Sequence, residues 1–257
     1  GYEWQDREFA NRLADCKNQL LIMQRPAKKL AAGKYHAYLA PAAVGEIIDT
    51  INWGGFSLKK IRTKQSPLCQ LAGGQKSLSD KFSLCENTKS GLAPHFDAKG
   101  FARPDVVSLI ENGKYVDSLA NARSAKEYSL TPNGANEQEM MQSADLAAGS
   151  LSQERVLTEL ESGLYVSNLW YMNFSDRHSC RLTGMTRFAT LWVESGEIVA
   201  PVEVMRFDDE FYDLFGPKLE DFTRERSVLI SSSTYDRRDC ASSHLPGALI
   251  RDFNFTL

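Results

Sequence analysis

The feature that most constrains the fold is a series of short β-prone runs joined by tight turn signals. Residues 106–110 and 115–119 are rich in branched and aromatic side chains, and they flank Glu111-Asn112-Gly113-Lys114. Asn-Gly is the strongest short hairpin signal, because the favoured two-residue turn needs positive φ at both central positions. A second pair of runs turns at Glu194-Ser195-Gly196-Glu197, and residues 247–257 form a further β-prone run. These patterns predict strands as the main structural element.

Helical signals are fewer. Residues 3–23 carry apolar side chains at helical spacing, and residues 207–215 indicate a short helix. Pro41 suits the first turn of another helix, because its missing N–H would have no partner there. An apolar face follows it, made by Val44, Ile47, Ile48 and Ile51. We therefore expect an α+β fold that is β-rich, with mixed or antiparallel sheets and a few helices.

The domain organisation follows from the same pattern. Residues 1–27 begin abruptly in a helix-like sequence and reach a break at Pro26. We expect this segment to be a helix left from a preceding domain or linker. Residues 28–257 carry the β-rich pattern and are expected to form the main domain.

Charge and composition exclude several classes of function. The net charge is −3, and basic residues alternate with acidic ones, as in Arg224-Glu225-Arg226, so we expect no direct contact with nucleic acid. Runs of about 20 apolar residues, which a membrane helix needs, do not occur. The five cysteines are odd in number and widely spaced, and the first residues lack the basic-then-apolar layout of a signal peptide. Reduced thiols in the cytoplasm are therefore expected.

The hexamer Pro41-Ala-Ala-Val-Gly-Glu46 decides whether the chain can be a peptidase alone. With histidine at both ends and glutamate second, it would be a zinc-binding metallopeptidase segment. Catalytic zinc takes three donor side chains and leaves a position for water. Proline has no donor atom, Ala42 cannot move a proton, and Glu46 alone does not make a site. We interpret the segment as a helix start with a solvated or capped glutamate, and we assign no catalytic residue.

A replacement metal site would have to come from other residues. His178 and Cys180 would point the same way on a strand, and Cys240 and His244 are four residues apart. Each pair supplies only two ligands, so we interpret all four as surface or half-buried polar residues. Metal binding by them remains the alternative, and no cofactor is predicted unless that alternative holds.

An aromatic run follows the middle of the chain. Residues 169–174 read Leu-Trp-Tyr-Met-Asn-Phe and alternate as in a strand, so half of the rings are expected to face a core. The other half could form a binding wall. For any single ring, core packing is the favoured interpretation.

Three stretches, taken in order, resemble the TldD/PmbA family, whose members are described as modulators of DNA gyrase or as zinc-dependent proteases. Residues 95–115 resemble its Asp-x-x-Gly stretch and the following Leu-Ile-Glu-Asn-Gly. Residues 161–202 resemble its Gly-Leu-Tyr-Val strand and its final Gly-Glu-Ile hairpin. Residues 37–48 fall where active members carry His-Glu-x-x-x-His. Pro41, Ala42 and Glu46 stand at the three functional positions of that motif, as in the TldE/PmbA-like type.

The resemblance implies a cytoplasmic protein that works in pairs. One subunit would carry zinc and cleave unfolded or extended peptides, in peptide maturation or protein degradation. This chain would be the non-catalytic partner, in a homodimer or in a heterodimer with a TldD-like zinc peptidase subunit. Two alternatives stay open: a self-sufficient zinc metallopeptidase with a divergent site, and a gyrase-related regulatory binding protein.

Overall fold

The computed structural model describes residues 4–232, 234 and 238–256. Its helices are α1 (Asp6–Met23), α2 (Pro41–Asn52), α3 (Leu58–Arg62), α4 (Cys69–Ala72), α5 (Ala122–Glu127), α6 (Val156–Leu160) and α7 (Phe211–Leu214). Its strands are β1 (Gly33–Leu39), β2 (Leu84–Asn87), β3 (Val106–Glu111), β4 (Lys114–Tyr115), β5 (Ser143–Leu146), β6 (Gly163–Asp176), β7 (Arg181–Glu194), β8 (Glu197–Pro201), β9 (Arg206–Glu210), β10 (Leu219–Ile230) and β11 (Ser242–Phe255). The expected β-rich α+β fold is confirmed.

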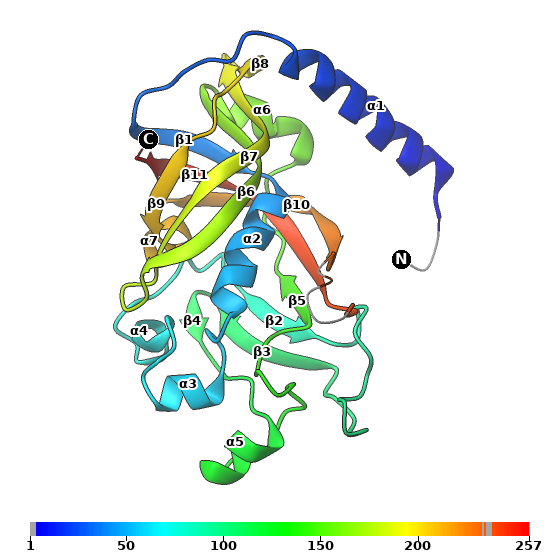
Figure 1. Ribbon diagram of the computed structural model, residues 1–257, viewed down its shortest axis with the longest axis vertical. Coiled ribbons are helices and arrows are strands. Elements are labelled where there is room, and N and C mark those ends of the chain that lie inside the picture. The colour runs from blue at the N-terminus through cyan, green and yellow to red at the C-terminus, as the bar shows by residue number, and fades with distance from the viewer. Residues whose placement is uncertain (1–3, 233, 235–237, 257) are drawn as a thin grey trace.

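The long strands form a closed ring of pairings. β1 pairs with β6 in parallel, β6 with β7, β7 with β9, and β9 with β11, and β11 returns to β1 as an antiparallel partner. β8 joins β7 and β10 joins β11. β11 also pairs in parallel with β5, which continues the sheet through β2 and β3 to β4. The sheet is therefore mixed, and in Figure 1 the ring of strands lies above the smaller β2–β5 region.

Helix α2 lies between these two regions in Figure 1. Its start is tied to β6, because the backbone N–H of Ala40 donates to the carbonyl of Val166 at 2.9 Å. All four apolar residues expected on its inner face are fully buried. At Gly45 the helix approaches β10 and β11 so closely that a Cβ there would lie 2.9 Å from Leu229 Cδ1. The opposite face of α2 is left for the site described below.

Helix α1 confirms the expected N-terminal helix, but it contributes no buried residue to the core. It extends away from the rest of the molecule in Figure 1. The segment after it is attached to β8, since Arg25 Nη1 donates to the carbonyl of Val199 at 2.8 Å. None of the helices in the described residues combines the length and apolar character needed to span a bilayer. The proposed boundary at residue 27 stays a prediction.

Both predicted hairpin turns are confirmed, but the strand expected over residues 115–119 is limited to β4, Lys114–Tyr115. Glu111 pairs with Lys114 and Glu194 pairs with Glu197, and each turn places its two central residues at positive φ. The expected helix over residues 207–215 is wrong in its first half, which is strand β9. Phe207 and Asp209 both point inward there, and the buried carboxylate of Asp209 is compensated by Lys218 Nζ at 2.7 Å. An inward acid with a paired lysine is compatible with a strand, and only residues 211–214 remain helical.

Candidate functional site

An open cleft of about 380 Å³ lies between α2 and β6. Its volume falls in the roughly 300–1,000 Å³ range typical of ligand pockets. The residues that line it come from two places: Glu46, Asp49 and Thr50 from α2, with Trp53 directly after its end, and Trp170, Tyr171, Met172 and Asn173 from β6. The α2 residues and Trp53 follow the i, i+3, i+4, i+7 spacing of one helix face. The cleft therefore begins at the last position of the hexamer that the sequence singled out.

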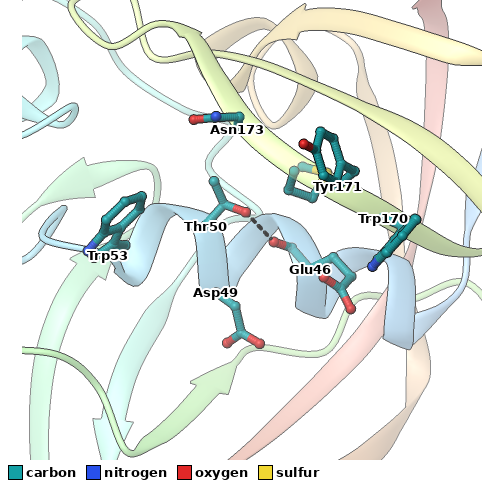
Figure 2. Close-up of a pocket in the computed structure, with 8 residues that line it drawn as sticks. Glu46, Asp49, Thr50, Trp53, Trp170, Tyr171 and Asn173 are labelled. Atoms are coloured by element: carbon teal, nitrogen blue, oxygen red, sulfur yellow. Dashed lines mark hydrogen bonds between the residues drawn. The ribbon is translucent and has the colours of Figure 1, made fainter. Parts of the chain in front are cut away.

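Glu46 is half-buried on this helix face. Loss of water around the carboxylate raises its pKa, and the positive charge of Arg187 opposes that effect in part. The backbone carbonyl of Glu46 accepts a hydrogen bond from Thr50 Oγ1 at 2.7 Å, which leaves the carboxylate itself uninvolved (Figure 2). The loss of water around the Glu46 carboxylate is thus only partly compensated by a positive charge, and this carboxylate borders the cleft.

Asp49 lies one turn further along the same face. The pKa of Asp49 is raised to about 6. The main cause is crowding by protein atoms, which removes water from the carboxylate although the residue keeps an exposed surface. The negative charges of Glu46 and Asp239 raise the pKa further. Asp239 belongs to the connection between β10 and β11. Three acids from two segments therefore influence one another at this end of the cleft.

The β6 wall of the cleft is aromatic and exposed. Trp170 is 47% exposed and Tyr171 is 73% exposed, although they are neighbours on one strand. Strict alternation would bury one of them, so the favoured interpretation of core packing is wrong for both. A β-bulge explains the difference: the register shifts between Trp170 and Asn173, and Tyr171 adopts a left-handed φ of 54°. Bulges of this kind re-aim side chains, and they are frequent beside functional sites.

A second bulge lies opposite, on β7. Phe188 has a φ of 58°, and its side chain is 66% exposed. Left-handed backbone at a bulky residue costs on the order of 1–3 kcal/mol, and such residues gather at functional sites. The two bulges together display an aromatic surface beside the cleft.

Two arginines already stack on these aromatic rings. The guanidinium of Arg187 lies 4.2 Å from the centre of the Trp170 ring and 4.6 Å from that of Phe188. Arg177 lies 4.5 Å from the ring centre of Phe174 and 5.7 Å from that of Trp53. Faces of this kind attract cations through the ring quadrupole. The walls of the cleft are therefore suited to positively charged groups.

The start of α2 does not fit a catalytic zinc ion. Pro41 occupies the first turn, where it offers no donor atom, and Ala42 follows with a methyl group. Glu46 is the only residue at the three motif positions with a side chain that can bind a metal. Within the described residues, no three side chains of His, Cys, Asp or Glu gather closely enough to hold an ion. The donor set needed for zinc chemistry is not present at this helix.

The four alternative metal candidates lie in two places. His178 and Cys180 belong to the turn between β6 and β7, not to a strand, so the expectation that they point the same way is wrong. His178 is exposed, whereas Cys180 is fully buried, and burial raises the pKa of its thiol. A buried neutral thiol is a poor zinc ligand, because the metal binds the thiolate.

Cys240 and His244 are also separated in the structure. Cys240 is exposed on the connection before β11. His244 lies within β11, with Nδ1 3.9 Å from Asp145 Oδ2. Burial and the charge of Arg226 lower the pKa of His244. The structure gives His244 a carboxylate neighbour on β5 that the sequence did not indicate.

Several residues of the cleft escaped the sequence analysis. Asp49 and Trp53 continue the spacing of Glu46 along α2, so a search of the polar helix face would have found them. The aromatic run of residues 169–174 was named as a possible binding wall, but nothing in it indicated that Trp170 and Tyr171 are both exposed, because the bulge that exposes them depends on pairing with β7.

Fold and site together define an α+β domain in which a helix and a long bulged hairpin enclose an open acidic and aromatic cleft. Residues 32–257 match the family model described as PmbA/TldA metallopeptidase C-terminal domain. The chain belongs to the TldD/PmbA family. No curated protein matches the chain.

Solved structures share the fold at low sequence identity. TldE from Thermococcus kodakarensis matches with a TM-score of 0.80 and 16% identity, over 95% of this chain and 55% of that one. A protein from Thermotoga maritima, named as a candidate modulator of DNA gyrase, matches with a TM-score of 0.72 and 19% identity, over 90% and 51%. A protein of the same description from Bacteroides thetaiotaomicron gives 0.72 and 16%, over 95% and 51%. The chain thus spans about half the length of these proteins.

Proposed function

We propose that the chain is the metal-less subunit of a peptidase pair in the cytoplasm. A related subunit with an intact His-Glu-x-x-x-His motif supplies zinc and cleaves unfolded or extended peptides, and this chain helps to hold them in the cleft between α2 and β6. The physiological process is peptide maturation or protein degradation. When no related subunit is present, two copies of this chain would pair with each other as a homodimer.

The observation that carries the proposal is the first turn of α2. Pro41 and Ala42 begin the helix on which zinc-bearing relatives are expected to carry a ligand and the general base. Neither side chain can bind a metal or accept a proton. The cleft further along the same helix is nevertheless formed, with half-buried acid and exposed rings on its walls. A binding role without local chemistry accounts for both facts.

A mixing experiment tests this proposal. The purified chain is incubated with an unfolded protein substrate, alone and together with a family member that carries His-Glu-x-x-x-His, and fragments are followed by mass spectrometry. The chain alone gives no cleavage, and the mixture gives cleavage that a chelator stops.

The matched control replaces the histidine motif of the added subunit with Ala residues, which abolishes cleavage in the mixture. Robust chelator-sensitive cleavage by this chain alone would refute the proposal. That result would favour the alternative of a self-sufficient metallopeptidase, and a Cys240→Ser variant would then show whether Cys240 is one of the ligands.

A further inference from the structure

We propose that the cleft between α2 and β6 receives an arginine or lysine side chain of the bound peptide. This inference rests on the proposed function, and it adds a substrate preference to it. The occupant is chosen by charge complementarity: the helix side of the cleft carries Glu46 and Asp49, and the strand side carries the rings of Trp170 and Tyr171.

The acids of the cleft form no direct ion pair within the described residues. In the part of the chain that the structure describes, neither the Glu46 nor the Asp49 carboxylate has a hydrogen-bond or salt-bridge partner. The buried acids Asp209 and Glu86 do have one, in Lys218 and Arg103 respectively. An acid that has lost water without gaining a partner favours the arrival of a cation. A guanidinium or ammonium group from a peptide would supply that partner.

The nearby arginines do not already fill this role. Arg187 lies over the rings of Trp170 and Phe188, and its charge only partly offsets the desolvation of Glu46. Arg177 lies over Phe174 and Trp53, at the other end of the cleft. These contacts show that the rings accept stacked cations while the carboxylates stay unpaired. A long basic side chain can use both, with its stem along the aromatic wall and its head at the acids.

The backbone that holds the aromatic wall in place is conformationally strained. Tyr171 is left-handed within a bulge that faces Gly184, where a Cβ would lie 2.7 Å from Met172 Sδ and 3.1 Å from the carbonyl oxygen of Trp170. The glycine therefore permits the close approach that the bulge requires. The strained arrangement exposes both rings, whereas an unbulged strand would bury one of them, and this agrees with a binding role.

Calorimetry with matched peptides tests the inference on the full chain. Two end-capped nonapeptides of glycine, serine and valine differ only at the centre, where one has arginine and the other glutamine. The arginine peptide binds about tenfold more tightly, as expected for charge-assisted hydrogen bonds. Glu46→Gln, combined with Asp49→Asn, removes this difference by weakening the binding of the arginine peptide. Glu154→Gln, an exposed acid on the turn before α6, is the matched control and keeps the difference.

A variant that is expected to strengthen binding distinguishes an effect on the cleft from a loss of folding. Arg187→Gln removes a competing positive charge and strengthens binding of the arginine peptide by about twofold to threefold, a gain that misfolding cannot mimic. Equal affinities of the wild-type chain for the two peptides, or no binding of either, would overturn the inference. The proposed function is tested separately by the mixing experiment: cleavage of both peptides at equal rates by the pair would leave that function intact and still reject the preference for a basic side chain.

Discussion

Glu46 and Asp49 occupy the polar face of a helix whose opposite face is fully buried, and this arrangement was partly readable from the sequence. The apolar positions from Val44 to Ile51 predicted which side of α2 faces the core. Glu46 was identified as the one motif position able to bind a metal, but its role as a wall of a cleft was not. That role depends on β6, which begins more than a hundred residues later in the chain. The local spacing of residues determines which face of α2 is polar, but only the folded structure determines that this face lies opposite β6.

The raised pKa of Asp49 predicts a pH-dependent effect of Asp49→Asn. The folded state keeps the proton up to about pH 6, whereas the ordinary value is 3.8, so stability falls as pH rises between these values. The variant lacks this penalty and gains about 1 kcal/mol in unfolding free energy at pH 7.5, less than the whole shift corresponds to because the residue is exposed. Urea unfolding at pH 7.5 and near pH 4 measures the gain, which shrinks toward the lower pH.

The control for that measurement is Asp252→Asn, the same change at an exposed position on β11. It leaves the unfolding free energy unchanged at both pH values. A gain for Asp49→Asn that is equal at pH 7.5 and pH 4 would contradict the electrostatic explanation.

At the scale of elements, turns were predictable and strand partners were not. The two hairpin turns carry their own signals in Asn112-Gly113 and Ser195-Gly196, because positive φ is a local requirement. The parallel pairings of β1 with β6 and of β11 with β5 join distant segments and leave no local pattern. The same reason explains the missed bulges, which exist only in relation to the partner strand. It also explains why residues 207–210, which belong to β9, were expected to be helical.

The close approach of β1 to β6 predicts that Gly163→Ala destabilises the ring of strands. A Cβ at this position would lie 2.2 Å from the carbonyl oxygen of His36, which is backbone and cannot turn aside. We expect a loss of about 3 kcal/mol in unfolding free energy, at the upper end of typical overpacking costs. Gly33→Ala on β1 is the control, because the nearest atom to its Cβ is Tyr35 Cε2 at 3.8 Å. Equal urea midpoints for the two variants would contradict this account of β1 and β6.

At the scale of the whole molecule, the class of fold was predicted and the closed ring was not. The density of β-prone runs was sufficient for a β-rich α+β assignment. Closure of the ring requires β11 to pair with both β9 and β1, and the same strand also pairs with β10 and β5 along its length. Nothing in the sequence of residues 242–255 distinguishes a strand with one partner from a strand with several.

Helix α1 is expected to contribute little to the stability of the rest of the molecule. It buries no residue, so deletion of residues 1–23 changes the unfolding free energy of the remainder by less than about 0.5 kcal/mol. The contacts made after the helix remain, including the hydrogen bond from the N–H of Lys28 to the carbonyl of Pro201 at 2.7 Å. Calorimetric melting of the full and shortened chains compares them. A drop of several degrees in the shortened chain would place α1 within the folded unit and reject the boundary at residue 27.

The central claim is that the first turn of α2 has no donor set for zinc, so that any peptidase activity comes from a partner. Elemental analysis of the purified chain after incubation with zinc and removal of excess metal tests this most directly. We predict well below one zinc per chain, with no change in a Glu46→Gln variant. About one zinc per chain, lost on substitution of Glu46 or Cys240, would contradict the account.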